Sequence, residues 1–387
     1  MKHKLSLETV LNRGVSDIIV REHLERRLRY GKKLRVKLGI DPTAPDIHLG
    51  HTIVLRKMRQ FQNLGHKAVL IIGDFTAQIG DPSGQSAERK LLTEKEVENN
   101  LRHYLKQAGK VIDLKKAEIR YNSEWLKKLN GKKLAELLTL VSVQQMIERN
   151  DFKERIETGR SLRMSELLYP VFQGYDSVIV KADIELGGAD QRFNLLMGRT
   201  LMERFNMTPQ DILTTPLLEG IDGVRKMSKS YGNYIGVMDK PNDMFGKIMA
   251  IPDSLIEKYF ITLTDTDFPK HLEPREAKML LGEIIVSQYH SPKKALNAKH
   301  EFVRVFSKKE TPDKVLEIRV AKTISILDIL LLAKVPSKSE ARRLIDRGAV
   351  KINNSLKTNQ DEILSLKNGD IIKIGKRRFF KIKLKEI

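Results

Sequence analysis

The chain has 387 residues, of which 41% are hydrophobic and 31% charged, so it suits folded domains and excludes a disordered chain or a fibrous repeat. Lys and Arg number 70 against 49 Asp and Glu; the formal net charge of +21 predicts a polyanionic partner, meaning nucleic acid, a nucleotide or an anionic membrane surface. The absence of cysteine excludes disulfides, thiolate nucleophiles and zinc sites with sulfur ligands.

The length predicts two to three domains. No stretch approaches 18 uninterrupted apolar residues, and the first residues lack the apolar core of a secretory signal. We therefore expect a soluble protein with no membrane partner. A cysteine-free chain also agrees with a reducing compartment, and we expect a cytoplasmic location.

The first regular elements form a strand–helix–strand unit. Apolar residues alternate over 35–41, which predicts a strand, and helical apolar spacing follows over about 50–64, with Gly65 placed as a C-terminal cap. The continuous apolar run 68–72 is typical of a parallel strand buried on both faces. This order predicts a right-handed βαβ unit and hence an α/β fold with a doubly wound, Rossmann-like parallel sheet.

Further along the chain, the pattern predicts parallel strands around 177–182 and near 183–186. Residues from about 87 to 164 are charged and mostly helical in pattern, which we interpret as an insertion between two halves of the sheet. Residues from about 243 to 306 are again helical in pattern and predict a small separate helical domain. The expected domains are thus 1–240, 241–320 and 321–387.

The last segment differs in charge and in pattern. Residues 321–387 hold 16 Lys and Arg against 7 acids, which is 9 of the 21 excess charges. Helices are predicted over 325–333 and 337–347, the second starting with a Ser337/Glu340 capping box, and short strands around 350–352 and 371–374. The segment therefore predicts a small basic α+β domain.

Two motifs suggest chemistry on phosphates. His48-Leu-Gly-His51 lies where the first strand's loop meets a helix N-terminus, whose free N–H groups favour anions, and Gly50 permits close approach of a phosphate or ribose. Lys226-Met-Ser-Lys-Ser230 puts two ammoniums and a hydroxyl on a loop bracketed by glycines, which suits a clamp for nucleotide phosphates. Either motif alone also fits an ordinary polar helix cap or a solvated basic turn.

Taken together, the two motifs resemble the signatures of class I aminoacyl-tRNA synthetases. Residues 41–43, 79–83, 173–176 and 187–191 occur in the order typical of bacterial tyrosyl-tRNA synthetases. Residues 337–353 are similar to an S4 RNA-binding domain, which that family carries as its tail. The resemblance covers essentially the whole chain. It implies tyrosine activation with ATP, accompanied by Mg²⁺, then transfer of tyrosine to tRNA(Tyr) by a homodimer with residues 141–148 near its interface.

The resemblance also implies roles for individual residues. Asp176 would accept the phenolic O–H of tyrosine. The α-ammonium of tyrosine would be held by Asp81, Tyr169, Gln173 and Gln191. ATP and the adenylate would meet Asp41, Gly50, Gly188, Asp190 and Lys229. The catalytic donors to phosphate would be Thr43, His48, His51, Lys226, Lys229 and Ser230. The RNA contacts would come from Lys338, Arg342, Arg343 and Arg347. No metal-ligating residue is expected.

Two positions depart from the family pattern. Lys37 stands where related enzymes have a tyrosine that contacts the substrate phenol, so the second partner of the phenol is not given by the resemblance. Gln85 stands where a phosphate-binding loop has a lysine, although Arg89 matches the arginine that follows. One phosphate contact therefore lacks its usual residue.

The implied reaction needs no protein base, because the carboxylate of tyrosine is itself the nucleophile at neutral pH and attacks the α-phosphorus of ATP. Catalysis then consists of positioning and of stabilising charge on phosphate oxygens. Two other interpretations remain: a small-molecule nucleotidyltransferase, which would not need the 226–230 loop or a basic tail, and an RNA-binding scaffold that has lost activity.

Overall fold

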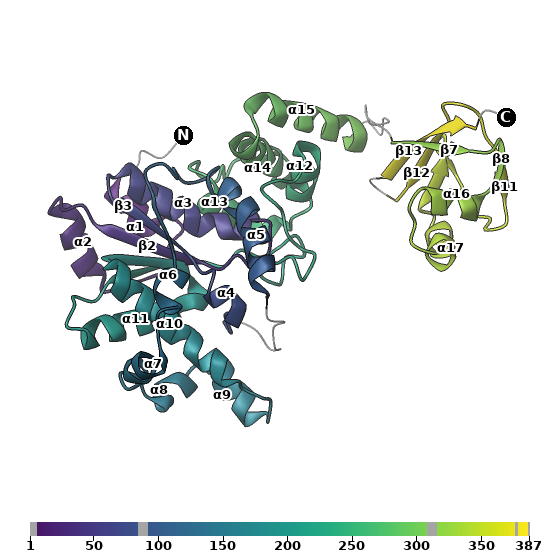
Figure 1. The fold of residues 1–387 in the computed structure, drawn as a ribbon. Helices are drawn as coiled ribbons and strands as arrows, with labels where there is room; N and C mark the ends of the chain where they lie inside the picture. Colours follow the sequence, from purple (N-terminus) through teal and green to yellow (C-terminus); the bar gives the residue numbers. More distant parts are fainter. Residues whose placement is uncertain (1–5, 84–91, 308–315, 376–377, 386–387) are drawn as a thin grey trace. The chain divides into compact units, whose positions relative to one another are not determined.

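The computed structural model describes residues 6–83, 92–307, 316–375 and 378–385 (Figure 1). The chain divides into two compact units, Met1–Leu296 and Asn297–Ile387. The helices between residues 241 and 296 belong to the same unit as the large sheet. The finer division at residues 240 and 320 stays a prediction.

A six-stranded sheet forms the centre of the first unit, in the order β1-β6-β5-β2-β3-β4. All neighbours are parallel except β1, which pairs antiparallel with β6. The register places Leu38 of β2 between Leu70 of β3 and Leu186 of β5. The strands are β1 (Asp17–Ile19), β2 (Arg35–Ile40), β3 (Lys67–Ile72), β4 (Glu118–Tyr121), β5 (Ile184–Gly188) and β6 (Asp211–Thr215).

The predicted βαβ unit is confirmed as β2, α3 (Leu49–Asn63) and β3. The helix ends where Gly65 adopts a φ of +92°, a conformation that glycine reaches without steric cost. Leu55, Met58 and Phe61 on α3 are fully buried, and α3 contacts β3 and β5. These contacts place α3 on one face of the sheet.

The other face of the sheet is covered by α10 (Met164–Val180) and α11 (Arg192–Arg204). Arg35 and Lys37, two residues apart on β2, both donate to backbone carbonyls of α10. Figure 1 shows α3 on one side of the sheet, with α10 and α11 on the other. The doubly wound fold predicted from the sequence is therefore confirmed.

One predicted strand is absent, and β4 was not predicted. The run 177–182 is no strand, because residues up to Val180 complete α10, whose apolar side chains pack into clusters on two sides. A β-branched apolar run can belong to a helix that is buried all round, and periodicity alone does not separate the two cases. Over its described residues, 92–164, the charged segment is mostly helical, as predicted, and it also contains β4, an edge strand of the sheet. Its helices are α5 (Glu94–Ala108), α6 (Ser123–Leu126), α7 (Gly131–Leu138), α8 (Val143–Ile147) and α9 (Asn150–Glu157).

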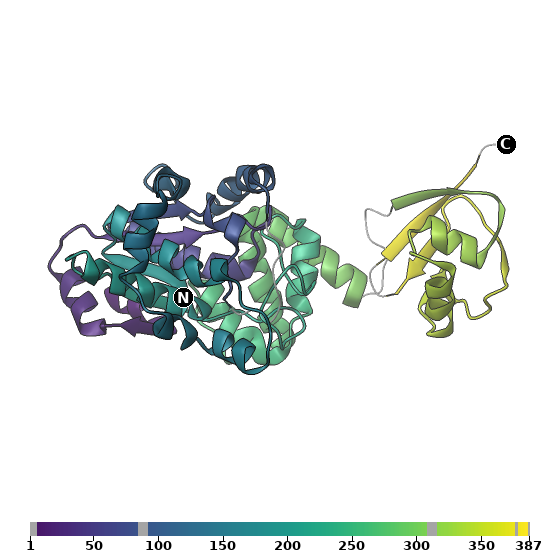
Figure 2. The ribbon, with the colours of Figure 1, turned by 60° about the horizontal axis from the view of Figure 1, so that its bottom comes forward.

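The helical character predicted for 243–306 is confirmed, and the helices of this stretch in the first unit pack beside α3 (Figures 1 and 2). The α13 helix contacts α3 directly. Within the described ranges, no helix combines the length and apolar character needed to cross a bilayer. The elements are α12 (Pro241–Met249), α13 (Ile256–Leu263), α14 (Pro274–Tyr289), α15 (Pro292–Phe302) and a π-helical turn (Val303–Ser307).

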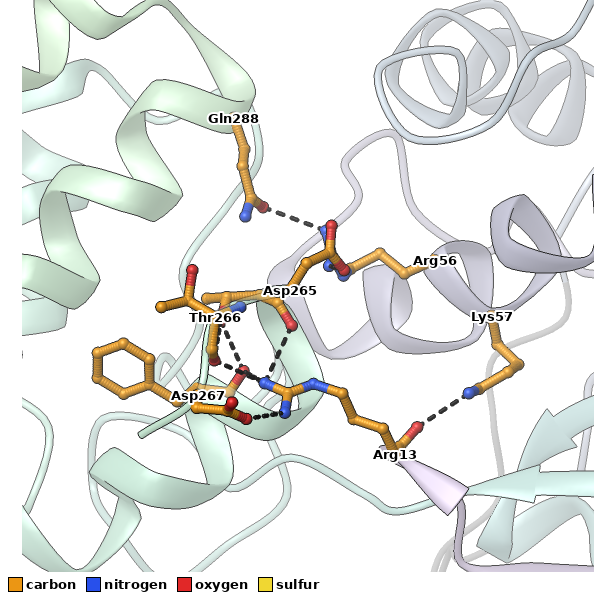
Figure 3. Close-up of polar contacts among 9 residues, drawn as sticks. Arg13, Arg56, Lys57, Asp265, Thr266, Asp267 and Gln288 are labelled. Carbon is orange, nitrogen blue, oxygen red and sulfur yellow. Dashed lines mark hydrogen bonds and ion pairs between the residues drawn. The ribbon is translucent and has the colours of Figure 1, made fainter. Parts of the chain in front are cut away.

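A polar cluster fixes α3 to segments distant in sequence (Figure 3). Arg13, after the first helix α1 (Leu7–Asn12), donates to Asp267 at 3.0 Å. Arg56 of α3 pairs with Asp265 at 2.5 Å, and Lys57 of α3 donates to the carbonyl of Arg13 at 2.9 Å. The helix that starts with the His48/His51 motif is thereby joined to the segment after α1 and to the loop after α13.

The second unit is α+β, as predicted. Its five-stranded sheet has the order β10-β9-β12-β13-β7, and a two-stranded β8–β11 ladder lies beside its helices. Ser337 caps the second helix by accepting from the Glu340 N–H at 3.2 Å. The elements are β7 (Leu316–Val320), β8 (Thr323–Ser325), α16 (Ile326–Leu332), α17 (Lys338–Asp346), β9 (Val350–Ile352), β10 (Ser355–Leu356), β11 (Ile363–Ser365), β12 (Ile371–Ile374) and β13 (Arg378–Leu384).

Candidate active site

A cavity of about 580 Å³ opens at the carboxyl ends of β2 and β5. The chain leaves β2 through α3 toward β3, whereas β5 lies on the other side of β2, so the winding reverses at this point. In doubly wound sheets such a reversal leaves a crevice in which ligands bind. Every residue predicted for substrate or catalysis lines the cavity except Lys229; the lining ones are Asp41, Thr43, His48, Gly50, His51, Asp81, Tyr169, Gln173, Asp176, Gly188, Asp190, Gln191, Lys226 and Ser230.

Asp176 is a buried carboxylate in the cavity wall, only 3% exposed. Trp125 donates its indole N–H to one carboxylate oxygen at 2.8 Å, and Asn122 reaches the other at 3.5 Å. Burial raises the pKa of Asp176 to about 7, opposed chiefly by the charge of Lys37. Asp176 can therefore exchange a proton near neutral pH, and when ionised it is a strong acceptor.

Two further carboxylates face the same part of the cavity. Asp41 accepts from the Tyr169 hydroxyl at 2.9 Å and from Thr76 at 2.8 Å. Asp81 accepts from the side-chain amide of Gln191 at 2.6 Å. Burial and the neighbouring carboxylates raise the pKa of Tyr169 far above its ordinary value, so this phenol stays protonated and donates. The group is acidic overall and suits a small cation.

His48 and His51 lie at the start of α3 with their rings stacked, the centroids 3.8 Å apart. Burial, His51 and Lys229 lower the pKa of His48 to about 2. Desolvation within the cavity and the charges of Lys226 and Lys229 lower the pKa of His51 to about 4. Both imidazoles are therefore neutral at physiological pH and act through hydrogen bonds.

One ring atom of this pair is poised for a ligand. His48 Nδ1 is buried and has no hydrogen-bond partner among the described residues. A side chain at Gly50 would place its Cβ 3.0 Å from that same atom, so glycine keeps the approach open. A buried polar atom without a partner is costly, which favours a ligand that bonds to it.

The 226–230 loop carries its cations at the rim of the cavity. Lys226 donates to Asp190 at 3.2 Å, whereas Lys229 points to Asp46 and forms an ion pair there instead of lining the cavity. Ser230 shares a hydrogen bond with Ser228 at 2.8 Å. The loop therefore presents two ammoniums whose present partners are carboxylates that a phosphate could replace.

The two motifs are joined through the backbone, although they are almost 180 residues apart. The Leu49 N–H donates to the Ile235 carbonyl, and the Val237 N–H donates to the Ile47 carbonyl, both at 2.9 Å. These bonds form an antiparallel bridge between His48 and Gly236. The imidazoles and the loop lysines are consequently held at one end of the cavity.

Lys37 is fully buried and does not line the cavity. Its ammonium donates to Glu185 at 2.6 Å, to Ser177 at 2.7 Å and to the Gln173 carbonyl at 2.9 Å. It therefore stands behind the cavity wall instead of replacing the missing phenol contact. Gln85 and Arg89 lie outside the described residues.

Sequence reasoning missed three polar residues that support the cavity. Thr76, Asn122 and Trp125 contact Asp41 or Asp176. Asn122 directly follows β4 and Trp125 lies on α6, the next helix; the charged composition of 87–164 gave no indication of β4. The alternation of Ile119 and Tyr121 before Asn122 was the available signal, since strand ends carry polar site residues in parallel sheets.

In the second unit, α17 turns its charged residues outward. Ala341 and Ile345 face the core, whereas the predicted RNA contacts are exposed. Two of them have acidic neighbours, Lys338 with Asp328 at 3.6 Å and Arg343 with Glu340 at 3.5 Å. The exposed residues are Lys338, Arg342, Arg343 and Arg347. Across the part of the chain that the structure describes, no cluster of three His, Asp or Glu is arranged to hold a metal ion.

Comparison with known proteins gives consistent results. A family model described as "tRNA synthetases class I (W and Y)" matches residues 29–307. A tyrosine–tRNA ligase of Carboxydothermus hydrogenoformans is 47% identical over 396 residues, 96% of each chain, and one of Thermotoga maritima is 44% identical over 385 residues, 96% of each chain. A solved tyrosyl-tRNA synthetase of Archaeoglobus fulgidus, complexed with L-tyrosine, is similar in fold, with a TM-score of 0.60 and 21% identity over 76% of this chain and 100% of that one.

Proposed function

This chain belongs to the class I tRNA synthetases of the tryptophan and tyrosine group, as one of the tyrosine–tRNA ligases, and from that premise we propose which of its residues carry the reaction. The enzyme activates L-tyrosine with ATP and charges tRNA with it. The observation that carries the assignment of the cavity is its two-ended construction. Asp176, a buried carboxylate of α10, lines the wall from one face of the sheet, which we call the amino-acid end; the neutral imidazoles at the start of α3 and the loop ammonium of Lys226 line it from the other, which we call the nucleotide end.

At the amino-acid end, Asp176 accepts the phenolic O–H of tyrosine. Phenylalanine would leave this buried acceptor unpaired, which costs more than the loss of a contact. The α-ammonium is held by carboxylate and neutral acceptors, a set that suits a cation. The proposed holders are Asp81, Tyr169, Gln173 and Gln191. The bond between Asp81 and Gln191 supports this group.

At the nucleotide end, His48, His51 and Thr43 donate to phosphate oxygens, and Gly50 and Gly188 admit the nucleotide close to the backbone. Asp190 contacts the ribose after Lys226 has turned from it to the phosphates, and Asp41 lies where the two substrates meet. Lys226, Lys229 and Ser230 neutralise the leaving pyrophosphate. Two observations support these roles. His48 Nδ1 is buried without a hydrogen-bond partner among the described residues, and Lys226 and Lys229 are paired with carboxylates that phosphate can replace.

The first step forms one bond and breaks one. A carboxylate oxygen of tyrosine attacks the α-phosphorus of ATP in line, and the bond from that phosphorus to the bridging oxygen of pyrophosphate breaks. Both electrons of the broken bond leave with pyrophosphate, so the protein needs no base and stabilises charge as it develops. Mg²⁺ bound to the phosphates of ATP would supply further positive charge there.

In the second step, a ribose hydroxyl at the 3′ end of tRNA(Tyr) attacks the carbonyl carbon of tyrosine and releases AMP. We propose that Lys338, Arg342, Arg343 and Arg347 contact tRNA phosphates, with the second unit acting as an S4-like RNA-binding domain. Exposure on one helix supports this assignment. Such contacts weaken steeply with salt because condensed counterions are released on binding.

The remaining assignments concern organisation. We propose a homodimer with residues 141–148 at its interface, supported by two exposed apolar side chains there, Val143 at 64% and Ile147 at 37%. The absence of cysteine supports a cytoplasmic location. The division into domains 1–240, 241–320 and 321–387 is proposed for the same molecule. The membership in the tyrosine–tRNA ligases leaves no observation that favours a nucleotidyltransferase or an inactive scaffold.

The test is amino-acid-dependent exchange of pyrophosphate with ATP, run with each of the twenty amino acids and without tRNA. Tyrosine alone should support rapid exchange. Rapid exchange with tryptophan, or none with tyrosine, would contradict the proposed role of the cavity.

A further inference from the structure

A buried polar network lies behind the cavity wall. Lys37, Ser177, Glu185 and Gln210 are each at most 1% exposed. The Ser177 hydroxyl and the Gln210 amide both donate to the Glu185 carboxylate at 2.8 Å, and Lys37 donates to its other oxygen at 2.6 Å. The network thus joins β2, α10, β5 and the segment before β6 in one water-excluded place.

The network reaches the cavity wall through α10. Lys37 donates to the Gln173 carbonyl and to the Ser177 hydroxyl, which lie on either side of Asp176 in the sequence. Asp176 and Gln173 themselves line the cavity. A single ammonium therefore fixes the stretch of helix from which both proposed tyrosine contacts project.

Such a network is expensive to bury. Desolvating an ammonium and a carboxylate costs several kcal/mol per ion, and an apolar pair of similar size is often as stable. Stability alone is therefore a weak reason for this pair. A positive charge in a dry interior, by contrast, acts strongly on a nearby carboxylate.

We propose that Lys37 is a positioning residue for tyrosine recognition, which holds α10 from behind and supplies the buried positive charge that favours the accepting, ionised form of Asp176. The inference rests on the proposed role of Asp176 as the acceptor of the phenol. It gives Lys37 a part in selecting the substrate without any contact to it.

The charges around Asp176 agree with this role. Lys37 from β2 opposes the burial that raises the pKa of Asp176, and Glu185 from β5 raises that pKa further. Tyr169, on the same helix, is a neutral phenol. Asn122 and Trp125 face the carboxylate as neutral donors. Lys37 is thus the cation of the network that acts on this carboxylate.

The experiment compares Glu185→Gln with Lys37→Met/Glu185→Gln, because the double variant removes both ions of the buried Lys37–Glu185 pair together. The readout is kcat/KM for tyrosine against pH in pyrophosphate exchange. The acid limb of this profile is the pH range in which protonation of Asp176 lowers kcat/KM. In Glu185→Gln this limb should move to lower pH, because the negative charge of Glu185 is lost. The limb of the double variant should lie about one pH unit above that of Glu185→Gln. At pH values below the limb, this shift is about a tenfold loss of kcat/KM. The KM for ATP should not change.

A matched control comes from the same strand. Arg35→Met/Glu118→Gln removes an ion pair of β2 that also bonds α10, through the Val180 carbonyl. It should leave the limb and the KM for tyrosine unchanged. Melting temperatures of all variants separate a loss of fold from a loss of recognition. If the double variant does not fold, Lys37→Gln/Glu185→Gln is measured in its place. If that variant does not fold either, the acid limb of Glu185→Gln is compared with that of the wild type.

Asp176→Asn distinguishes a failure of the proposed role of Asp176 from a failure of the proposed role of Lys37. If it leaves the acid limb and the KM for tyrosine unchanged, the proposed role of Asp176 fails. If Asp176→Asn abolishes the limb but the folded double variant matches Glu185→Gln in limb and in KM, only the role of Lys37 is overturned. A limb in Glu185→Gln identical to that of the wild type would also overturn it.

Discussion

The two ends of the cavity are built from different kinds of structure. At the amino-acid end, Asp176 and Tyr169 come from one long helix, are at most 5% exposed, and bond to partners on other regular elements or immediately after a strand. At the nucleotide end, Lys226, Lys229 and Ser230 come from an irregular segment and are partly or fully exposed. Asp176 and Tyr169 are therefore buried and held by fixed partners, whereas the loop side of the nucleotide end is open.

This difference matches what each substrate requires. Discriminating tyrosine from phenylalanine depends on one hydroxyl, so the acceptor must be fixed and dry for an unpaired state to be costly. Negative charge shifts among the phosphate oxygens during the reaction. The groups that donate to these oxygens therefore need partners that they can exchange. We therefore expect damage at the amino-acid end to appear in tyrosine binding and damage at the nucleotide end to appear in turnover.

The largest effect should follow His51→Ala. Removing a donor to developing phosphate charge costs about 100-fold to 1,000-fold in kcat. The KM for tyrosine should stay near its wild-type value, since His51 lies at the other end. Steady-state pyrophosphate exchange measures both. His103→Ala, an exposed histidine of α5, is the control and should behave as wild type. A large rise in the KM for tyrosine would break the comparison between the two ends.

A smaller effect is expected from Asp176→Asn. A hydrogen bond to a charged group contributes about 1.5 to 3 kcal/mol, so kcat/KM for tyrosine should fall about tenfold to hundredfold. The loss should appear chiefly in the KM for tyrosine, with the KM for ATP unaltered. Discrimination against phenylalanine should fall in parallel. Unchanged discrimination would show that the phenol is recognised elsewhere.

The wild-type enzyme should also depend on Asp176, and this dependence should appear in its pH profile. Because the pKa of Asp176 is raised to about 7, kcat/KM for tyrosine should fall about tenfold for each pH unit below 7. The effect on folding has the opposite sign: protonation favours the folded state, so this contribution is fully present below pH 3.8 and is lost as pH rises through 7. Rate profiles and melting temperatures, compared with those of Asp176→Asn, would reveal both trends. Profiles of equal shape would exclude Asp176 as their source.

The smallest effect should come from outside the cavity. Arg342→Ala/Arg343→Ala should raise the KM for tRNA several-fold and reduce the slope of log affinity against log salt by about two. Pyrophosphate exchange should be untouched, since neither end of the cavity is altered. Lys381→Ala/Lys383→Ala removes equal charge from β13 and is the control. Equal losses in both variants would assign the effect to general charge.

The elements that the sequence predicts well are those with a clear period. The 35–41 alternation, the apolar spacing of α3 and the run 68–72 each appear as predicted. The run before Val180 failed because a helix buried all round lacks a polar face. The β4 strand was not predicted because it contains Glu118 and Arg120, charged residues that an edge strand tolerates.

The site divides in the same way. The family resemblance indicated the residues that line the cavity, because its motifs are short runs that occur in a fixed order along the sequence. Pairings across the fold were not predictable: Lys229 with Asp46, Tyr169 with Asp41, and Lys37 with Glu185. Each of these joins residues more than 100 positions apart, and only the packed sheet decides which of them meet.

The bond from Trp125 to Asp176 has a practical consequence. Trp125 is the single tryptophan of the chain, so the intrinsic ultraviolet emission of the protein beyond its tyrosines arises at one place. The indole N–H donates to the carboxylate that we propose as the acceptor of the phenol. On that proposal, we expect the emission of the unlabelled enzyme to report tyrosine binding, and a dye at the ATP end would complement it.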